Sequence, residues 1–245
     1  MNELFFALHD GLPREGPGDD ALTVRAFRGL GSLPPRPALL DVGCGPGAQT
    51  VTLASLGADV VAVDVHEPFL RETERRAGER GVADRVRTVR ASMTDLPFGD
   101  GAFDVVWSEG AIYLMGFGAG LRAWRRVLRP GGAIAVSELT WIARDPPAEA
   151  KRFWDAAYPA MTTVEANRRA LAESGYTPLA ELVFPVTAWF ANYYDPLERR
   201  IAMLRERHAR EPDAQAWLDE QQAEIDLARR CGDAYAYVFY LGRRD

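Results

Sequence analysis

The chain has 245 residues, of which 47% are hydrophobic and 26% charged, and its formal net charge is −6. This composition is typical of a single globular domain, and the negative charge argues against a nucleic acid as partner, because a phosphate backbone requires a basic surface. The N-terminus lacks the basic start and cleavage pattern of a signal peptide, and no apolar run approaches the length of a membrane span. We therefore expect a cytoplasmic protein without a membrane partner. We also expect no metal site, because two cysteines are too few for a zinc ligand set.

Residues 1–33 are predicted to form an N-terminal cap segment. Residues 2–9 are rich in aromatic side chains, residues 11–20 contain too much glycine and proline for regular structure, and a helix is expected from Ala21 to Leu30. Two interpretations remain open for this segment. It is either a plain packing helix or a lid that places Phe5, Phe6, His9 and Arg14 over a bound ligand.

A glycine-rich turn follows the first predicted strand. The strand covers Ala38 to Val42, the glycines are Gly43, Gly45 and Gly47, and a helix begins near Gln49. Glycines allow positive φ angles and close approach of a ligand, so this turn predicts a nucleotide-type site. A dinucleotide site accepts the same spacing.

The residues beside the glycines favour a cationic ligand over a pyrophosphate. Asp41 adds a carboxylate at the end of the strand, and Pro46 removes one N–H donor from the turn. The run D-V-G-C-G-P-G resembles motif I of the class I methyltransferases, which bind S-adenosyl-L-methionine and release S-adenosyl-L-homocysteine. This resemblance implies cofactor contacts by Asp41, Gly43, Cys44 and Gly45, and Arg14 could pair with the methionine carboxylate of the cofactor.

The next two strands are predicted over Asp59 to Asp64 and Arg85 to Ala91, with a charged helix between them. Asp64 ends its strand 17 residues after Gly47, where a carboxylate can accept hydrogen bonds from both ribose hydroxyls. Val65 adjoins it. The loop A-S-M-T-D-L-P-F is similar to the G-D-A-x-x-L-P-F of the family, so Ser92 replaces an aspartate that often accepts from the adenine amino group, and Met93 is expected to pack on adenine.

A fourth strand ends at Trp107, and the resemblance places the following loop against the transferable methyl group. Ser108 is predicted to contact the cofactor. Glu109 could be a general base, a partner of a cationic amine or a hydrogen-bond acceptor for cofactor or substrate; alternatively it only caps the next helix. Tyr113 could donate to the substrate or fill a helix interface. We predict Glu109 and Tyr113 as the catalytic residues.

A helix over Leu121 to Leu128, the run L-R-P-G-G and a fifth strand over Ala133 to Glu138 complete the resemblance, which spans Pro37 to Leu139. Glu138 ends its strand and either faces the pocket or pairs with an arginine. We expect residues 34–145 to form the cofactor-binding core and residues 146–245 a substrate-side cap with closing strands. In that region the patterns predict two helices, a strand over Leu179 to Phe190, two charged helices and a last strand over Ala234 to Leu241.

The predicted fold is an α/β, Rossmann-like, seven-stranded and mostly parallel sheet with helices on both faces, N-terminal helices and a C-terminal helical insertion that forms a cap. The resemblance implies methyl transfer to an O, N or S nucleophile of a small molecule. A protein or RNA methyltransferase, a cofactor-binding protein without activity and a nicotinamide oxidoreductase remain alternatives, and a homodimer is compatible with the sequence. Five aromatic residues form a pool for the acceptor pocket, although such a stripe is more often core: Trp141, Trp154, Tyr158, Trp189 and Tyr194.

Overall fold

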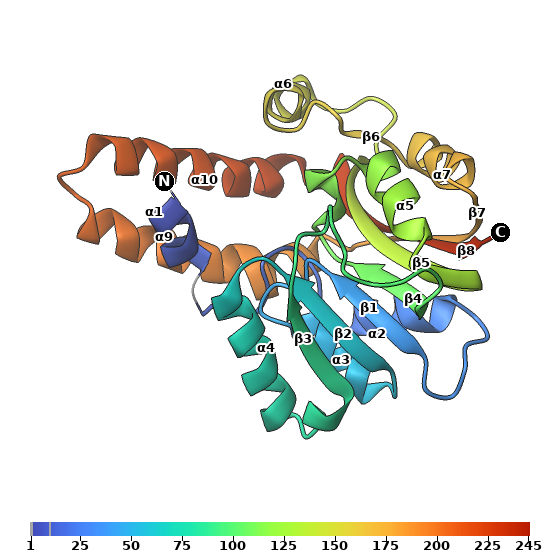
Figure 1. The fold of residues 1–245 in the computed structure, drawn as a ribbon. Coiled ribbons are helices and arrows are strands. Elements are labelled where there is room, and N and C mark those ends of the chain that lie inside the picture. The colour runs from blue at the N-terminus through green and yellow to red at the C-terminus, as the bar shows by residue number, and fades with distance from the viewer. Residues whose placement is uncertain (1, 10) are drawn as a thin grey trace.

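The centre of the computed structural model, which describes residues 2–9 and 11–245, is a mixed β-sheet with helices on both faces (Figure 1). The strands follow the order β3-β2-β1-β4-β5-β8-β7, and the two-residue β6 pairs with β5. Strands β3, β2, β1, β4 and β5 are parallel, whereas β8 runs antiparallel to both of its neighbours. The bounds are β1 Ala38–Val42, β2 Asp59–Asp64, β3 Val86–Arg90, β4 Phe103–Ser108, β5 Leu128–Trp141, β6 Thr162–Thr163, β7 Tyr176–Val183 and β8 Tyr235–Arg244.

This topology confirms the predicted Rossmann-like fold, and the path of seven strands is the predicted sheet. Strand β1 occupies the centre because its residues Leu39, Leu40 and Val42 are fully buried, as a strand covered on both faces requires. The chain order reverses between β1 and β4, which neighbour each other in the sheet. A crevice at the carboxyl ends of the strands is expected at such a point, and it is here that the glycine turn lies.

Helices α2 (Asp20–Gly29), α3 (Ala48–Ser55) and α4 (Glu67–Glu79) cover one face of the sheet, and α5 (Phe117–Arg125) and α7 (Val164–Glu173) cover the other (Figure 1). Each face has its own apolar cluster. Leu22 and Leu53 pack with Trp107 on the first face, whereas Trp124 and Leu171 belong to the cluster on the second. The two clusters hold the parallel strands rigidly, so the loops at their ends have fixed starting points.

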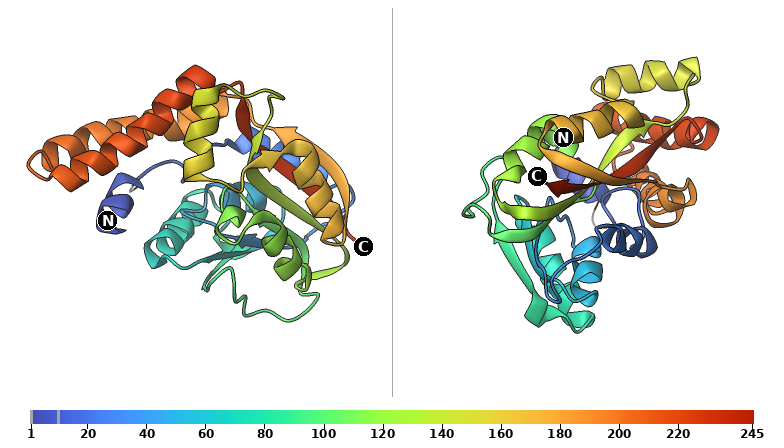
Figure 2. Two further views of the ribbon diagram at one scale, coloured as in Figure 1. Left: turned by 90° about the horizontal axis from the view of Figure 1, so that it is seen from above. Right: turned by 90° about the vertical axis from the view of Figure 1, so that its right-hand side faces the viewer.

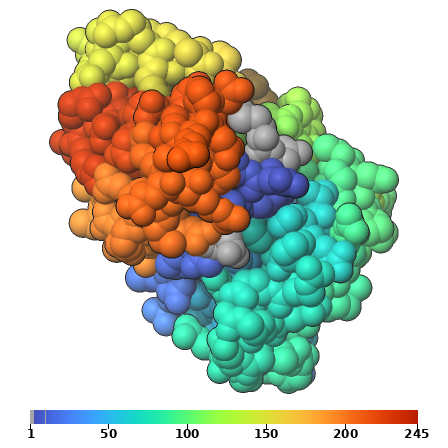
Figure 3. Space-filling view, turned by 90° about the vertical axis from the view of Figure 1, so that its left-hand side faces the viewer, coloured from blue at the N-terminus to red at the C-terminus, as the bar shows by residue number. Residues whose placement is uncertain are grey.

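The remaining helices form a cap. They are α1 (Asn2–His9), α6 (Ala148–Ala157), α9 (Asp195–Arg207) and α10 (Pro212–Cys231). Helices α9 and α10 form an antiparallel pair that projects from the sheet (Figure 2), and α1 lies between this pair and α4 (Figure 3). The cap has its own core, which contains four of the five aromatic residues in the predicted pocket pool, namely Trp141, Trp154, Trp189 and Tyr194. These four residues therefore belong to a hydrophobic core, which was the alternative to a pocket lining.

The strand predicted over Leu179 to Phe190 is wrong in its second half. Strand β7 begins earlier, at Tyr176, and ends at Val183. Pro185 has no N–H for the β-ladder, and the chain then forms α8 (Thr187–Trp189) and a π-helix (Phe190–Tyr194) that leads into α9. Trp189 and Tyr194 are buried in the cap core, so tertiary packing overrides the β propensity of this apolar run.

None of the helices in residues 2–9 and 11–245 combines the length and the apolar character that crossing a membrane would need.

Candidate active site

A cavity of about 370 Å³ lies at the carboxyl ends of β1, β2 and β4, between the glycine turn and the loops that follow the strands. We call it the cleft. Twelve residues were predicted to bind cofactor or to act in catalysis, and the structure brings ten of them together around the cleft: Arg14, Gly43, Cys44, Gly45, Asp64, Val65, Ser92, Met93, Glu109 and Tyr113.

The backbone donors of the glycine turn are already occupied within the protein. The N–H groups of Gly43 and Cys44 donate to the carbonyl of Val63 at 2.9 and 3.0 Å, and that of Gly47 donates to the carbonyl of Cys44. The N–H of Gly45 donates to Asp64 Oδ2 at 3.1 Å. Pro46, the remaining residue, has no N–H. The turn therefore offers no ring of free donors, which a pyrophosphate would need.

Gly43 explains how the turn packs against the loop that follows β4. Its φ angle is +70°, and a Cβ atom added to it would lie 2.6 Å from the Cβ of Ala111. A larger residue would separate the turn from this loop. The contact keeps two walls of the cleft together.

Asp64 presents its carboxylate at the end of β2. Its Oδ2 accepts from the Gly45 N–H, and its Oδ1 accepts from the His66 N–H at 2.8 Å. These contacts fix the side chain, and each oxygen keeps a second lone pair for a ligand in the cleft. Val65, which follows, is exposed at the rim.

The loop after β3 forms the next wall. Ser92 and Thr94 share a hydrogen bond between their hydroxyl groups at 2.7 Å. The carbonyl of Met93 accepts from Trp124 Nε1 at 2.9 Å, which fixes the backbone of the loop against α5. The wall therefore combines a hydroxyl pair with a thioether, the chemistry predicted for contact with an adenine ring.

Asp41 and Ser108, the two other predicted residues, do not line the cleft among the described residues. Asp41 is fully buried beneath the turn, where its carboxylate accepts from Thr50 Oγ1 at 2.5 Å and from Gln49 Nε2 at 3.4 Å. Burial raises the pKa of Asp41 to about 7, although the hydrogen bond from Thr50 lowers it. Ser108 donates to the carbonyl of Val42 at 2.9 Å. Both side chains point inward and support the turn, so the prediction of direct contact is corrected to an indirect role.

Glu109 is held by three donors from three elements. Its Oε1 accepts from Trp107 Nε1 and from Thr23 Oγ1, both at 2.9 Å, and its Oε2 pairs with Arg14 at 3.0 Å. Burial raises the pKa of Glu109, and the charge of Arg14 opposes that rise. A general base needs a carboxylate oxygen that is open toward the acceptor, and these contacts favour a structural role instead.

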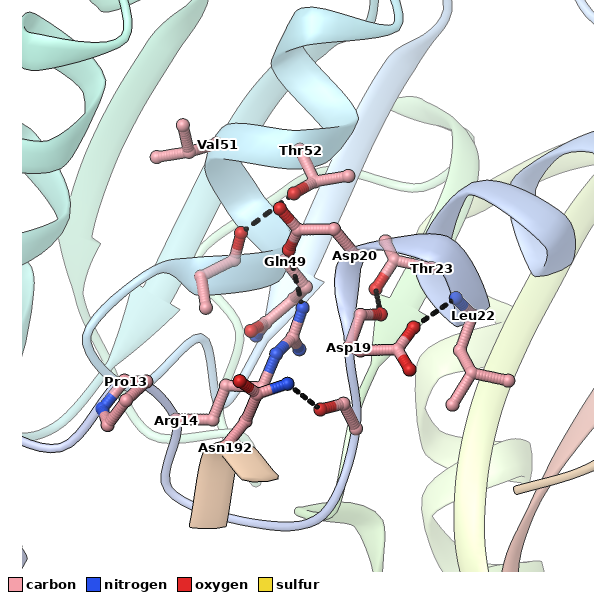
Figure 4. A network of polar contacts seen from close by, with 12 residues as sticks. Pro13, Arg14, Asp19, Asp20, Leu22, Thr23, Gln49, Val51, Thr52 and Asn192 are labelled. Carbon is pink, nitrogen blue, oxygen red and sulfur yellow. Dashed lines mark hydrogen bonds and ion pairs between the residues drawn. The ribbon is translucent and has the colours of Figure 1, made fainter. Parts of the chain in front are cut away.

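Arg14 extends from the loop over residues 11–19 and pairs with Asp20 at 2.9 Å (Figure 4). It also pairs with Glu109 at 3.0 Å. Asn192 fixes the same loop by donating to the carbonyl of Gly18 at 3.1 Å (Figure 4). Two of the five guanidinium N–H groups account for the pairs with Asp20 and Glu109. The loop is therefore anchored to α2 through Asp20, to the segment after β4 through Glu109 and to the π-helix through Asn192.

The N-terminal segment combines both predicted interpretations. Helix α2 is a packing helix, because Leu22, Ala26 and Leu30 are buried against the sheet. The chain before it forms a lid, since Phe5 and Arg14 line the cleft. Phe6 lies outside the cleft, where its ring stacks on His66 with a centroid separation of 3.9 Å. His9 is also outside, near Tyr193.

Some lining residues were not predicted. They belong to the lid, to the first turns of α3 and α4 and to the segment after β4: Glu15, Gly16, Pro17, Gln49, Phe69, Ala111, Leu114 and Met115. Their only signal is their position in the chain next to motif residues.

Comparison with known proteins identifies the central part of the chain. Residues 40–136 match the family model described as a methyltransferase domain. This part of the chain is therefore similar to a methyltransferase domain, and we call it the matched segment. The matched segment contains the glycine turn, Asp64, the Ser92 loop and Glu109, so the predicted resemblance is confirmed over residues 40–136.

The chain is also similar in sequence to curated methyltransferases. The chain is 36% identical over 131 residues to malonyl-[acyl-carrier protein] O-methyltransferase of Pseudescherichia vulneris, covering 48% of this chain and 49% of that protein. It therefore spans about half the length of this relative. It is 28% identical over 219 residues to 27-O-demethylrifamycin SV methyltransferase of Amycolatopsis mediterranei, covering 86% of this chain and 78% of that protein.

A solved structure has a similar fold over the whole chain, including the cap that lies outside the matched segment. A SAM-dependent methyltransferase from Geobacter sulfurreducens, crystallised with S-adenosyl-L-homocysteine, superposes with a TM-score of 0.83 at 19% identity, covering 100% of this chain and 99% of the other. At this identity the likeness concerns the fold alone.

Proposed function

We propose that the chain is an enzyme that transfers a methyl group from S-adenosyl-L-methionine to a small-molecule acceptor. The observation that carries this proposal is the glycine turn, whose N–H groups are all engaged while the carboxylate of Asp64 faces the cleft. A pyrophosphate would find no free N–H donor among turn residues 43–47 and would meet a negative charge. A cofactor with a sulfonium, an ammonium and a ribose fits this site.

The cofactor supplies a sulfonium, whose methyl group is already activated for transfer. The residues of the chain bind the cofactor and orient it toward the acceptor. Asp64 accepts from the ribose hydroxyls, Ser92 and Met93 contact the adenine, and the remaining N–H groups of Arg14 bind the methionine carboxylate. Catalysis then rests mainly on holding the acceptor in line with the sulfur–methyl bond.

Glu109 and Tyr113 act at the methyl end of the cleft. We propose that Glu109 keeps Arg14 and the lid in place, because three donors already bind its carboxylate. Tyr113 lines the cleft, and its ring meets that of Tyr158 at a centroid separation of 5.9 Å in an edge-to-face arrangement. Tyr113 therefore connects the cleft to the cap and contacts the acceptor.

Small molecules are the proposed acceptors, because the relatives named above are methyltransferases of small or carrier-bound compounds. We further propose a cytoplasmic protein with no nucleic-acid or membrane partner, supported by the net charge of −6. A homodimer stays a prediction. Methylation of a protein or RNA, and cofactor binding without turnover, are the alternatives that the experiments below separate.

Calorimetric titration with S-adenosyl-L-methionine, S-adenosyl-L-homocysteine and NADH tests the cofactor. We expect both sulfur compounds to bind and NADH to give no heat. Release of S-adenosyl-L-homocysteine in the presence of a metabolite library then distinguishes an enzyme from a binding protein. Binding of NADH alone would overturn the proposal.

Replacing Asp64 tests the ribose contact. In Asp64→Ala the Kd of S-adenosyl-L-methionine should rise at least about tenfold, or about 1.4 kcal/mol, because the ribose hydroxyls lose a charged acceptor. Asp59→Ala is the matched control, since Asp59 lies at the other end of β2 and pairs with Arg36 outside the cleft. Equal affinities for the two variants would remove Asp64 from the site.

A further inference from the structure

Glu138 is a buried carboxylate with neither a counter-ion nor an aligned hydrogen bond among the described residues. It lies near the end of β5 with 2% of its surface exposed. Neither of its carboxylate oxygens accepts a well-aligned hydrogen bond from the described residues. An unpaired buried carboxylate is costly, so a native protein that keeps one has a reason outside its own hydrogen bonds.

The groups around Glu138 are tyrosines. Burial raises the pKa of Glu138 to about 7, and the nearby hydroxyl of Tyr158 and backbone N–H of Leu139 oppose the rise, although neither forms an aligned hydrogen bond. Burial likewise raises the pKa values of Tyr113 and Tyr237, and the negative charges of Glu138 and Glu224 add to both shifts. No cationic side chain of the described residues contributes to the pKa of Glu138.

This tyrosine cluster adjoins the cleft. Tyr113 lines the cleft and packs edge to face on Tyr158. Gly110 also lines the cleft, and the hydroxyl of Tyr237 lies 3.9 Å from the position that a Cβ on Gly110 would occupy. The N–H of Gly110 donates to Ser137 Oγ at 2.8 Å, directly before Glu138 in the chain. Glu138 therefore adjoins the wall of the cleft that Gly110 and Tyr113 form.

We propose that Glu138 and the rings of Tyr113, Tyr158 and Tyr237 form the acceptor subsite, and that the acceptor is an amine that binds as its ammonium ion. This inference rests on the proposed methyltransferase function and names its acceptor class. An ammonium supplies both things that Glu138 lacks, a positive charge and N–H donors. Tyrosine faces attract the same cation.

The Glu138 carboxylate can also accept the proton that the ammonium must lose before its nitrogen is methylated. The ammonium transfers one N–H proton to Glu138, and the freed nitrogen lone pair attacks the methyl carbon of S-adenosyl-L-methionine. The nitrogen–carbon bond forms while the sulfur–carbon bond breaks, and the electron pair of that bond stays on sulfur as S-adenosyl-L-homocysteine. Glu138 then carries the proton as a neutral acid, which its apolar surroundings favour.

A hydroxyl acceptor is the competing case. A phenol would also give its proton to Glu138, but before that step it would leave the carboxylate charged and without a counter-ion. The lack of any cation beside Glu138 in the described part of the chain therefore favours the amine.

Tetramethylammonium is the probe, because it has the shape and charge of the proposed group but no transferable proton. Calorimetry on the full chain saturated with S-adenosyl-L-homocysteine should show that tetramethylammonium binds at least tenfold more tightly than tert-butanol, a neutral compound of similar shape. The tenfold preference should disappear in Glu138→Gln and persist in Glu138→Asp. Glu220→Gln, on the exposed side of α10, is the control and should behave as wild type.

The same variants separate this inference from the methyltransferase proposal. Glu138→Gln should bind S-adenosyl-L-methionine as wild type does, which also shows that the variant is folded. A library of primary, secondary and tertiary amines should release S-adenosyl-L-homocysteine, and turnover should fall at least a hundredfold in Glu138→Gln. Equal binding of tetramethylammonium and tert-butanol, or turnover with phenols alone, would overturn the amine subsite while leaving methyl transfer intact. Failure of S-adenosyl-L-methionine to bind would overturn both.

Discussion

Arg14 and Glu109 illustrate how single residues control the cleft. They are 95 residues apart in the chain, yet their side chains pair at 3.0 Å with exposures of only 7% and 8%. Losing one member of a buried pair leaves an uncompensated charge, which costs much more than losing an exposed pair. The pair therefore fixes the lid in one position over the cleft.

A double-mutant cycle on Arg14→Gln and Glu109→Gln measures this effect. We expect a coupling of about 1–3 kcal/mol in the free energy of unfolding, since the two side chains share one network. The pair of Arg36 and Asp59 is the control, because its side chains are 62% and 42% exposed and should show much smaller coupling. If the two couplings were equal, the buried pair would not stabilise the lid.

Among single residues, the sequence predicts those that belong to a local pattern. The glycine turn and Asp64 follow from the spacing of a strand, a turn and a strand end, and the structure places them around one cleft. The partners of Glu109 could not be predicted, because Arg14 and Thr23 come from a segment joined to it only by the tertiary fold. The role predicted for Glu109 depended on those partners.

Among the elements, the contact between α3 and α4 depends on one glycine. Gly47 caps α3 with a φ angle of +82°, and a Cβ there would lie 2.5 Å from Thr73 Oγ1. Thr73, on α4, donates to the carbonyls of Gly45 and Phe69. The turn, α3 and α4 are therefore packed around a single position with no room for a methyl group.

Gly47→Ala should destabilise the protein by about 2–4 kcal/mol, because it adds left-handed strain to overpacking. Urea denaturation measures the change. Gly78→Ala is the matched control within α4, where an added Cβ meets nothing within 4 Å. That substitution should be neutral or stabilise by up to about 1 kcal/mol, because alanine favours a helix. A similar loss in both variants would contradict the packing argument.

The elements of the sheet were predicted well where a short apolar run lies close to a glycine or proline, as in β1 and β2. The error over Leu179 to Phe190 has a physical origin. An apolar run with aromatic residues fits a buried strand and a buried helix equally, and the cap core that selects the helix is assembled from α1, α6, α9 and α10.

The stability of the whole molecule should depend on pH through its buried acids. The pKa values of Asp41 and Glu138 are raised to about 7 because burial disfavours their charged forms. At these two groups the folded protein therefore binds more protons than the unfolded chain between about pH 4 and pH 7. Their contribution to stability falls as the pH rises through this window.

Asp41→Asn should remove part of this dependence. The difference in free energy of unfolding between Asp41→Asn and wild type should shift in favour of the variant by roughly 2–4 kcal/mol from pH 5 to pH 8. The reason is that Asp41 becomes a buried charge in wild type over this range, whereas asparagine stays neutral. Urea denaturation at both pH values gives the comparison. Asp59→Asn is the control, because the pKa of Asp59 is lowered by Arg36 and its difference from wild type should not change over this range. A constant difference for Asp41→Asn would contradict the prediction.

The lid forms a part of the cleft wall that can change in sequence without changing the sheet. Phe5, Arg14, Glu15, Gly16 and Pro17 form one wall of the cleft, yet all of them precede the first strand and none belongs to the sheet. Substitutions in this stretch can reshape the wall while the parallel strands keep their register. Part of the cleft wall is therefore encoded outside the sheet, and libraries at residues 15–17, which leave Arg14 in place, offer a route to altered ligand selectivity on an unchanged scaffold.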